Sequence, residues 1–388
     1  MPGARSGDDC ARRRNPGGAP GAGYNQGMTS LSDAAVLHAL RTVIDPDLHK
    51  DIVSLGFVKN LRITGGDVHF TVELTTPACP MKDLMREQAH AAVSALPGVS
   101  RVEIEMTAAV RATAFPADGT RPAVEGVKNI IAVGAGKGGV GKTTMAVNLA
   151  AALSARGSRV AIIDGDLYGP NVPMMLGLKT RLETDGQKIL PAEKYGMQIV
   201  SMASLTEDDA AVIWRGPMLH GAIQQFFREV RWTAIDYLIV DLPPGTGDVA
   251  ISLSQSVPVA GAVVVTTPQS VSISDTRRAV QMYRKLNIPV LGLIENMSHF
   301  VCPGCGSESD IFGKGGGERL ATDLSVPFLG HVPLHEPVRA AGDAGVPIVI
   351  GDPQSVPAAA IVAAAERLAQ QVSIASFPGR AIPLTEVR

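Results

Sequence analysis

Residues 129–145 read NIIAVGAGKGGVGKTTM, and this stretch decides the fold. A short β-branched run leads into a glycine-rich loop, and the helical segment MAVNLAAALSARG follows at 145–157. The loop satisfies G-x-x-x-x-G-K-[ST] in the strand and helix context that a phosphate-binding loop requires. Glycines let backbone N–H groups surround phosphate oxygens, and the helix N-terminus adds partial positive charge. A glycine-rich turn that binds nothing is the weaker alternative, because this pattern seldom arises by chance.

The loop predicts a site for ATP and Mg²⁺. We expect Lys142 to contact the β- and γ-phosphates and Thr143 to supply a hydroxyl to Mg²⁺. We also expect Lys142→Ala to abolish nucleotide-dependent function and to leave the fold intact, on the premise that this lysine is not a core residue. The predicted nucleotide-binding residues of the loop are Gly136, Lys137, Gly138, Gly139, Val140, Gly141, Lys142, Thr143 and Thr144.

The region after the loop repeats strands and helices in alternation. Short β-branched runs recur at 159–164, 237–243, 262–268, 289–296 and 326–333, with helical segments between them. Such alternation is typical of a parallel sheet with helices on both faces. The predicted fold class is therefore α/β, a P-loop NTPase with a mostly parallel sheet, preceded by a small N-terminal α/β domain.

Polar residues stand where three of these predicted strands end. Asp164 and Asp166 close the run at 159–164, Asp241 closes the next, and Asn296 ends the run at 289–296. Carboxylates at the C-terminal ends of parallel strands face the nucleotide crevice. We expect the three carboxylates near the nucleotide, although strand-end residues also serve as helix caps or turn residues.

The composition bounds the possible partners. The chain has 388 residues, a hydrophobic fraction of 45% and a formal net charge of −2, which gives no electrostatic footprint for nucleic acid. No apolar run reaches the 18 or so residues that span a bilayer, and the N-terminus lacks the apolar core of a secretory signal. We expect a soluble, cytoplasmic protein that engages neither nucleic acid nor membrane, and four cysteines with one CxxC pair fit that reducing compartment.

We predict five segments from composition and periodicity. They are a disordered tail or start-site artefact at 1–27, a small α/β domain at 28–110, a linker at 111–127, a P-loop ATPase domain at 128–374 and a C-terminal tail at 375–388. In the small domain we expect helices at 33–43 and 80–96 and strands at 66–76 and 99–110. Cys79 would then cap the second helix, where the dipole favours a thiolate, unless it is only a small capping residue.

Residues 302–306, CPGCG, carry half of a metal site. Cys302 and Cys305 have the spacing that presents two thiolates to one metal centre, but closed zinc sites and iron–sulfur clusters commonly take four protein ligands. His299, Cys79 and Cys10 are candidates within the chain. The other solution is a two-fold axis beside the loop, which brings in the same two cysteines of a second subunit.

Six segments together resemble the Mrp/ApbC family of iron–sulfur cluster carriers, which are P-loop ATPases of the MinD/ParA-like class. They are KGGVGKTT, DGDLYGPN, WRGPM, DLPPGTGD, NMSHFVCPGCG and PLHEPVRAAGDAGVPIV, in this order within 137–349. The motifs IDPDL, SLGFV and TTPACPMKD resemble the accessory domain of SufT/PaaD-type assembly factors.

The resemblance implies a function and roles for particular residues. It implies a homodimer in which Lys137 reaches the neighbouring nucleotide, Asp166 orients the attacking water, and Asp241 holds Mg²⁺ through water with Asp164 nearby. Asn296 would lie against the adenine ring. It further implies that Cys302 and Cys305 of two subunits bridge a [4Fe–4S] cluster, which passes between assembly scaffolds and apoproteins while ATP is hydrolysed slowly.

Two other functions are open at this stage. A MinD/ParA-like positioning ATPase would bind membrane or DNA, but the alanine-rich segment at 356–372 lacks the basic amphipathic character of a membrane-targeting helix. An electron-transfer protein like the nitrogenase iron protein also bridges a cluster across a dimer, but such proteins lack this CPxC pair and the N-terminal unit. Transfer of a cluster to an apoprotein would separate these functions.

Overall fold

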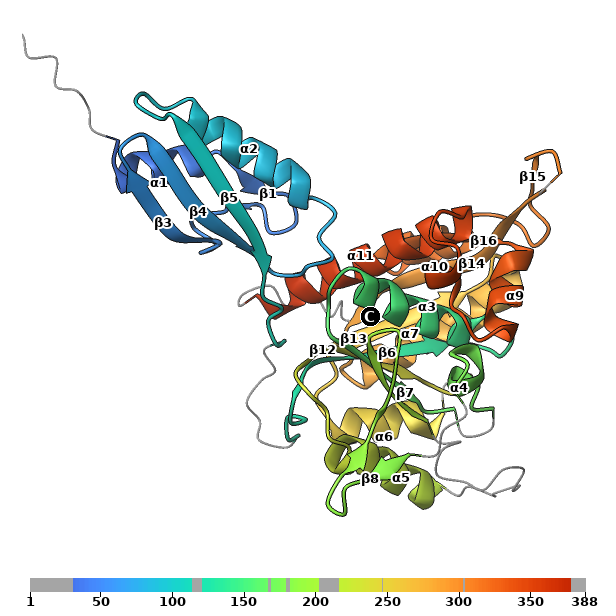
Figure 1. Ribbon diagram of the computed structural model, residues 1–388. Helices are drawn as coiled ribbons and strands as arrows, with labels where there is room; N and C mark the ends of the chain where they lie inside the picture. The colour runs from blue at the N-terminus through green and yellow to red at the C-terminus, as the bar shows by residue number, and fades with distance from the viewer. Residues whose placement is uncertain are drawn as a thin grey trace, which may run out of the picture.

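The computed structural model describes residues 31–113, 121–166, 169–178, 182–201, 216–245, 247–302 and 304–377. These residues form a large α/β unit and a smaller unit beside one end of it (Figure 1). The tail predicted at 1–27 and most of the tail predicted at 375–388 lie outside the described ranges. No helix in these ranges is long and apolar enough to cross a bilayer.

The large unit is built on a nine-stranded sheet, as far as the chain is described. Its order is β10-β11-β7-β12-β6-β13-β14-β15, and β16 also pairs with β14. Only β10 and β15 run antiparallel to their neighbours, which confirms the mostly parallel sheet. The strands are β6 (Val127–Ala135), β7 (Val160–Asp164), β10 (Ala192–Lys194), β11 (Met197–Ser201), β12 (Ile235–Asp241), β13 (Gly261–Thr266), β14 (Val290–Val301), β15 (Glu308–Ser309) and β16 (Phe328–Leu334). A separate two-stranded sheet pairs β8 (Glu183–Thr184) with β9 (Ile189–Leu190).

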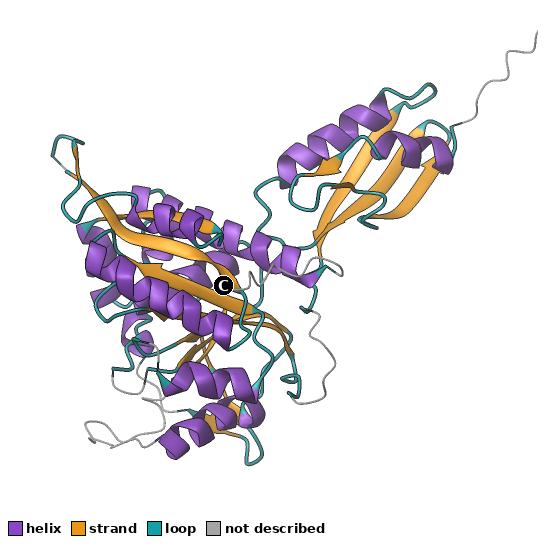
Figure 2. Ribbon diagram, turned by 180° about the vertical axis from the view of Figure 1, so that it is seen from behind, coloured by secondary structure: helices purple, strands orange, loops and turns teal. Residues whose placement is uncertain are grey.

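Alternate residues of the central strands supply two separate cores. In β6, Ile131 and Val133 face one cluster, whereas Ile130 and Ala132 face the other. This is the side-chain alternation of a strand that is buried on both faces. The first cluster packs under α3 (Lys142–Ala155), α4 (Val172–Met175), α9 (Glu336–Asp343), α10 (Ile348–Gly351) and α11 (Val356–Ser376). The second packs under α5 (Gly216–Glu229), α6 (Asp248–Ser256), α7 (Ser270–Lys285) and α8 (Gly316–Asp323), so helices cover both faces (Figure 2).

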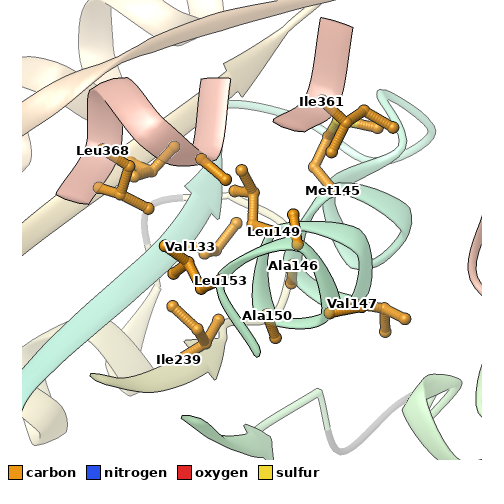
Figure 3. Packing of buried hydrophobic residues seen from close by; sticks show 14 of the residues in the cluster. Val133, Met145, Ala146, Val147, Leu149, Ala150, Leu153, Ile239, Ile361 and Leu368 are labelled. Carbon is orange, nitrogen blue, oxygen red and sulfur yellow. The ribbon is translucent and has the colours of Figure 1, made fainter. Parts of the chain in front are cut away.

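The helix that follows the glycine-rich loop is the centre of the first core. Met145, Leu149 and Leu153 of α3 are fully buried and pack between the sheet and α11 (Figure 3). These residues recur at every fourth position, which places them on one face of the helix. Burial of that face fixes the start of α3, and with it the loop that precedes it, against the sheet.

The small unit has its own sheet and core. β3 (Val58–Thr64) pairs antiparallel with β4 (Asp67–Leu74), which pairs parallel with β5 (Arg101–Ala108). The two helices, α1 (Asp33–Leu40) and α2 (Lys82–Ser94), pack on one face (Figure 2) and are shorter than the predicted 33–43 and 80–96. β3 and the short pair β1 (Ile44–Asp45) and β2 (Lys50–Asp51) were not predicted.

The end of α11 contacts the small unit. The rings of Phe377 and Phe57 meet edge to face, with centroids 6.4 Å apart. Ser373 Oγ donates a hydrogen bond to Thr75 Oγ1 at 2.7 Å, and Tyr237 Oη donates to Thr76 Oγ1 at 3.1 Å. The two units are therefore held together by packing as well as by the chain between them.

Candidate nucleotide and cysteine sites

The glycine-rich loop joins β6 to α3, as predicted from the sequence. Gly141 has a φ of 82°, and a Cβ atom there would lie 2.3 Å from Asn296 Nδ2, so only glycine fits. Gly138 and Gly139 are exposed, whereas Val140 is buried and Lys137 is half-buried. The loop thus combines a buried anchor with glycines that are open to a ligand.

Lys142 and Thr143 both bind Asp241. Lys142 Nζ donates a hydrogen bond to Asp241 Oδ1 at 2.6 Å, and Thr143 Oγ1 donates to Asp241 Oδ2 at 2.7 Å. Lys142 Nζ also lies 3.8 Å from Asp166 Oδ2. The Lys142 side chain is only 7% exposed, so this lysine is buried, contrary to the premise that it is not a core residue. The cluster brings together the loop and two of the predicted strand-end carboxylates.

Asp164 lies behind this cluster and is fully buried. Asp164 and Asp241 are register partners at the ends of neighbouring strands. Burial, with the nearby charge of Asp241, raises the pKa of Asp164 to about 7. Burial also raises the pKa of Asp241, and Lys142 opposes that shift. Two buried carboxylates ionise at a cost, and a bound divalent cation would stabilise their ionised form.

The oxygen atoms at this point fit Mg²⁺. Thr143 Oγ1 and the Asp241 carboxylate are hard oxygen donors, the type that Mg²⁺ prefers. Asp164 is held by three donors instead: Asp166 N at 3.2 Å, Val172 N at 3.1 Å and Ser201 Oγ at 3.1 Å. Ser201 was not predicted, because the strand that ends with it, MQIVS, was not recognised. Its short β-branched run after a Tyr-Gly turn is the signal that could have revealed it.

Asn296 contacts the loop directly. Its Nδ2 donates a hydrogen bond to the carbonyl of Val140 at 2.9 Å. Thr144 lies in the first turn of α3, where its carbonyl accepts from Asn148 Nδ2 at 2.9 Å. Gly136 sits against α7, because a Cβ atom there would lie 2.3 Å from the carbonyl carbon of Asp275. All the predicted nucleotide-binding residues therefore converge at the C-terminal edge of the sheet.

Cys302 and Cys305 lie at the tip of a β-hairpin, which we call the cysteine hairpin (residues 300–302 and 304–309). Phe300 pairs with Ser309 and Val301 with Glu308 in antiparallel register. Backbone bonds close the turn, from Cys302 N to Ser307 O at 2.9 Å and from Gly306 N to Cys302 O at 2.8 Å. The hairpin projects from the large unit (Figure 1).

The two thiols differ in exposure. Cys305 is exposed and Cys302 is half-buried. Hydrogen bonding to Ser307, whose Oγ lies 3.0 Å from Cys305 Sγ, lowers the pKa of Cys305. Within the described ranges, no third His, Cys, Asp or Glu joins this pair to form a group that could hold a metal, so neither His299 nor Cys79 does so. Cys10 lies outside those ranges.

The prediction for Cys79 was wrong in two respects. Helix α2 begins at Lys82 and Met81 holds the N-cap position, because Cys79 and Pro80 belong to the preceding turn. Burial raises the pKa of the Cys79 thiol to about 11, so the thiol is the favoured form at neutral pH. Desolvation therefore outweighs the helix dipole that the sequence suggested.

Family models match both units of this chain. Residues 126–371 match the family model described as the NUBPL iron-transfer P-loop NTPase. The chain belongs to this family. Residues 33–106 match a second model, that of an iron–sulfur cluster assembly protein.

Relatives of this P-loop NTPase are similar along most of their length. A protein of Synechocystis named an iron–sulfur cluster carrier protein is 48% identical over 353 residues, covering 89% of this chain and 99% of the relative. A protein of the same name from Deinococcus radiodurans is 49% identical, and the match covers 88% of this chain and 95% of the relative. Among solved structures, a nucleotide-binding protein of Archaeoglobus fulgidus in complex with ADP has a TM-score of 0.52 and 33% identity, covering 57% of this chain and 88% of its own.

Proposed function

We propose that this protein binds a [4Fe–4S] cluster between the cysteine hairpins of two identical subunits and transfers the cluster to apoproteins. The observation that carries the proposal is the isolated pair, Cys302 and Cys305, at the tip of a projecting hairpin with no third ligand from the described chain. A cluster with four thiolate ligands then needs a second copy. Both cysteines are free thiols, which fits the reducing cytoplasm.

The loop site would bind MgATP and hydrolyse it slowly. Phosphate oxygens would take Lys142 as their partner, Thr143 and Asp241 would hold Mg²⁺, and Asp166 would orient the attacking water. Asn296 would contact the adenine ring, and Lys137 would reach the nucleotide of the second subunit. Mg²⁺ supplies charge that stabilises the transferring phosphoryl group. The Lys142–Asp166 contact at 3.8 Å supports this set, because it places a carboxylate beside the phosphate-binding lysine.

We also propose a division of labour along the chain. The small domain at 28–110 would engage assembly scaffolds or apoprotein clients, and the linker at 111–127 would join it to the ATPase domain at 128–374. Support comes from the match of residues 33–106 to iron–sulfur cluster assembly proteins.

The test is the iron content of protein reconstituted anaerobically, measured together with its mass in solution. We expect four irons per dimer. Cys302→Ala and Cys305→Ala should each eliminate cluster binding and retain ATP binding, because the hairpin contributes nothing to the phosphate loop. Cys79→Ala is the matched control and should keep the cluster. Four irons on a monomer, or a full cluster after removal of both hairpin cysteines, would refute the bridged dimer.

Delivery is tested separately. Loaded protein is mixed with an apo-dehydratase, and the activity of the acceptor is followed with free iron chelated. Recovery of activity is expected from wild type and not from Cys302→Ala. A stable cluster that never leaves the protein would instead favour electron transfer.

A further inference from the structure

Strand β14 links the two sites, and it is irregular between them. Asn296 pairs with Val332 and Phe300 pairs with Leu334 on β16. Between these pairs β14 has residues 297–299, whereas β16 has only Pro333. Proline has no N–H to donate to a ladder, so the neighbouring strand is free to bulge there.

Met297, at the start of this bulge, has strained backbone. Its φ is 54°, a left-handed conformation that a non-glycine residue adopts at a cost. Ser298 fixes the bulge on the sheet side, because its Oγ donates a hydrogen bond to the carbonyl of Val332 at 3.2 Å. The strain therefore lies at a defined point of the strand and is held there by neighbouring residues.

The bulge borders the phosphate loop on one side. Met297 Cε lies 3.8 Å from the position that a Cβ atom on Gly141 would take. The adjacent residue, Asn296, bonds the carbonyl of Val140. A shift of the loop around Val140 and Gly141 would therefore displace Asn296 and the bulge that follows it.

The bulge leads into the cysteine hairpin on the other side. From Met297 the strand continues through Phe300, where hairpin pairing begins, to Cys302. Five residues of strand span about 16 Å. A small rotation about the bulge would be amplified at the hairpin tip over that length.

We propose that the bulge at Met297 couples the phosphate loop to the cysteine hairpin, so that bound nucleotide changes the exposure of Cys302 and Cys305. The inference rests on the proposed function for the binding of MgATP at the loop and for its consequence, the control of cluster loading or release by ATP. Met297 is a positioning residue, because it acts on the thiols through the strand.

The test measures alkylation of Cys302 and Cys305 in reduced, cluster-free protein, with and without saturating MgATP, by peptide mass spectrometry. Wild type should show a rate change of about fivefold or more. Met297→Gly accepts the positive φ without strain and removes the side chain that borders Gly141, so its ratio should fall to near one. Asn287→Gly is the matched control, because Asn287 also has a φ of 54° but precedes the other end of β14. It should keep the wild-type ratio.

Two results would overturn the coupling. One is a wild-type ratio of one, and the other is a Met297→Gly ratio equal to that of wild type. If Met297→Gly fails to fold, Met297→Ala keeps the Cβ atom and loses only the outer atoms that border Gly141, and its ratio should also fall. The assay needs no cluster, so a failure of the coupling is distinguishable from a failure of cluster binding.

Discussion

Lys142→Ala should destabilise the nucleotide-free protein as well as abolish ATP binding. The lysine is buried between Asp241 at 2.6 Å and Asp166 at 3.8 Å. Alanine would leave the Asp241 carboxylate, which is fully buried, without the cation that pairs with it. This expectation replaces the one drawn from the sequence, which was that the substitution leaves the fold intact.

The magnitude follows from the geometry of the pair. Removal of one partner of a buried ion pair costs about 3–5 kcal/mol. The cost is limited here because Asp241, whose pKa burial already raises, can take up a proton when Lys142 is absent. Thr143 also continues to donate to Asp241. We expect a loss of about 3 kcal/mol in the free energy of unfolding at pH 8, and less at pH 5.5.

The assay is urea unfolding followed by circular dichroism without nucleotide. Lys128→Ala is the matched control, because Lys128 Nζ lies 2.9 Å from Asp236 but is 36% exposed, and Arg159 also binds that carboxylate. Its loss should stay below about 1 kcal/mol. Asp241→Asn added to Lys142→Ala should recover part of the stability. Equal losses for the two lysine variants would refute the reasoning.

Two further predictions concern other parts of the chain. The raised pKa of Asp164 contributes stability at low pH that is lost as pH rises through about 7. The urea concentration at half unfolding of wild type should therefore decrease when the pH is raised from 5.5 to 8. Asp164→Asn should flatten that profile, and an unchanged slope would contradict the assignment. Phe377→Ala removes the ring contact with Phe57 and should weaken docking of the small unit by about 1 kcal/mol. Hydrogen exchange around Phe57 should rise while ATP hydrolysis is unchanged; equal exchange would count against this interface.

The sequence predicted what local spacing and strand order determine. The loop pattern fixed the position of Lys142 and Thr143, and strand ends in a parallel sheet placed Asp164 and Asp241 beside them. These relations need only the chain's own periodicity and the geometry of a parallel sheet. The same holds for the pair Cys302 and Cys305, whose CxxC spacing is local.

Contacts that depend on tertiary packing were not predictable in this way. The direct bond between Lys142 and Asp241 joins residues that are far apart in the chain, and only the fold sets its length. Cys79 was assigned a helix cap because Pro80 suits a first helical position, but tertiary burial decides both its conformation and its pKa. Residues 296–299 of β14 contain no glycine or other marker of the bulge at Met297. Pro333, which lies opposite the bulge, belongs to another strand.

The small unit, near the start of the chain, contacts residues at the end of helix α11, more than 260 residues later. The small unit has a complete core and is translated first, so it can fold early. Its docking partner, Phe377, emerges only after the whole ATP-binding unit has been made. Until then the small unit lacks its contacts with the end of α11, Ser373 and Phe377. Assembly of the finished architecture is therefore one of the last events in the synthesis of this protein.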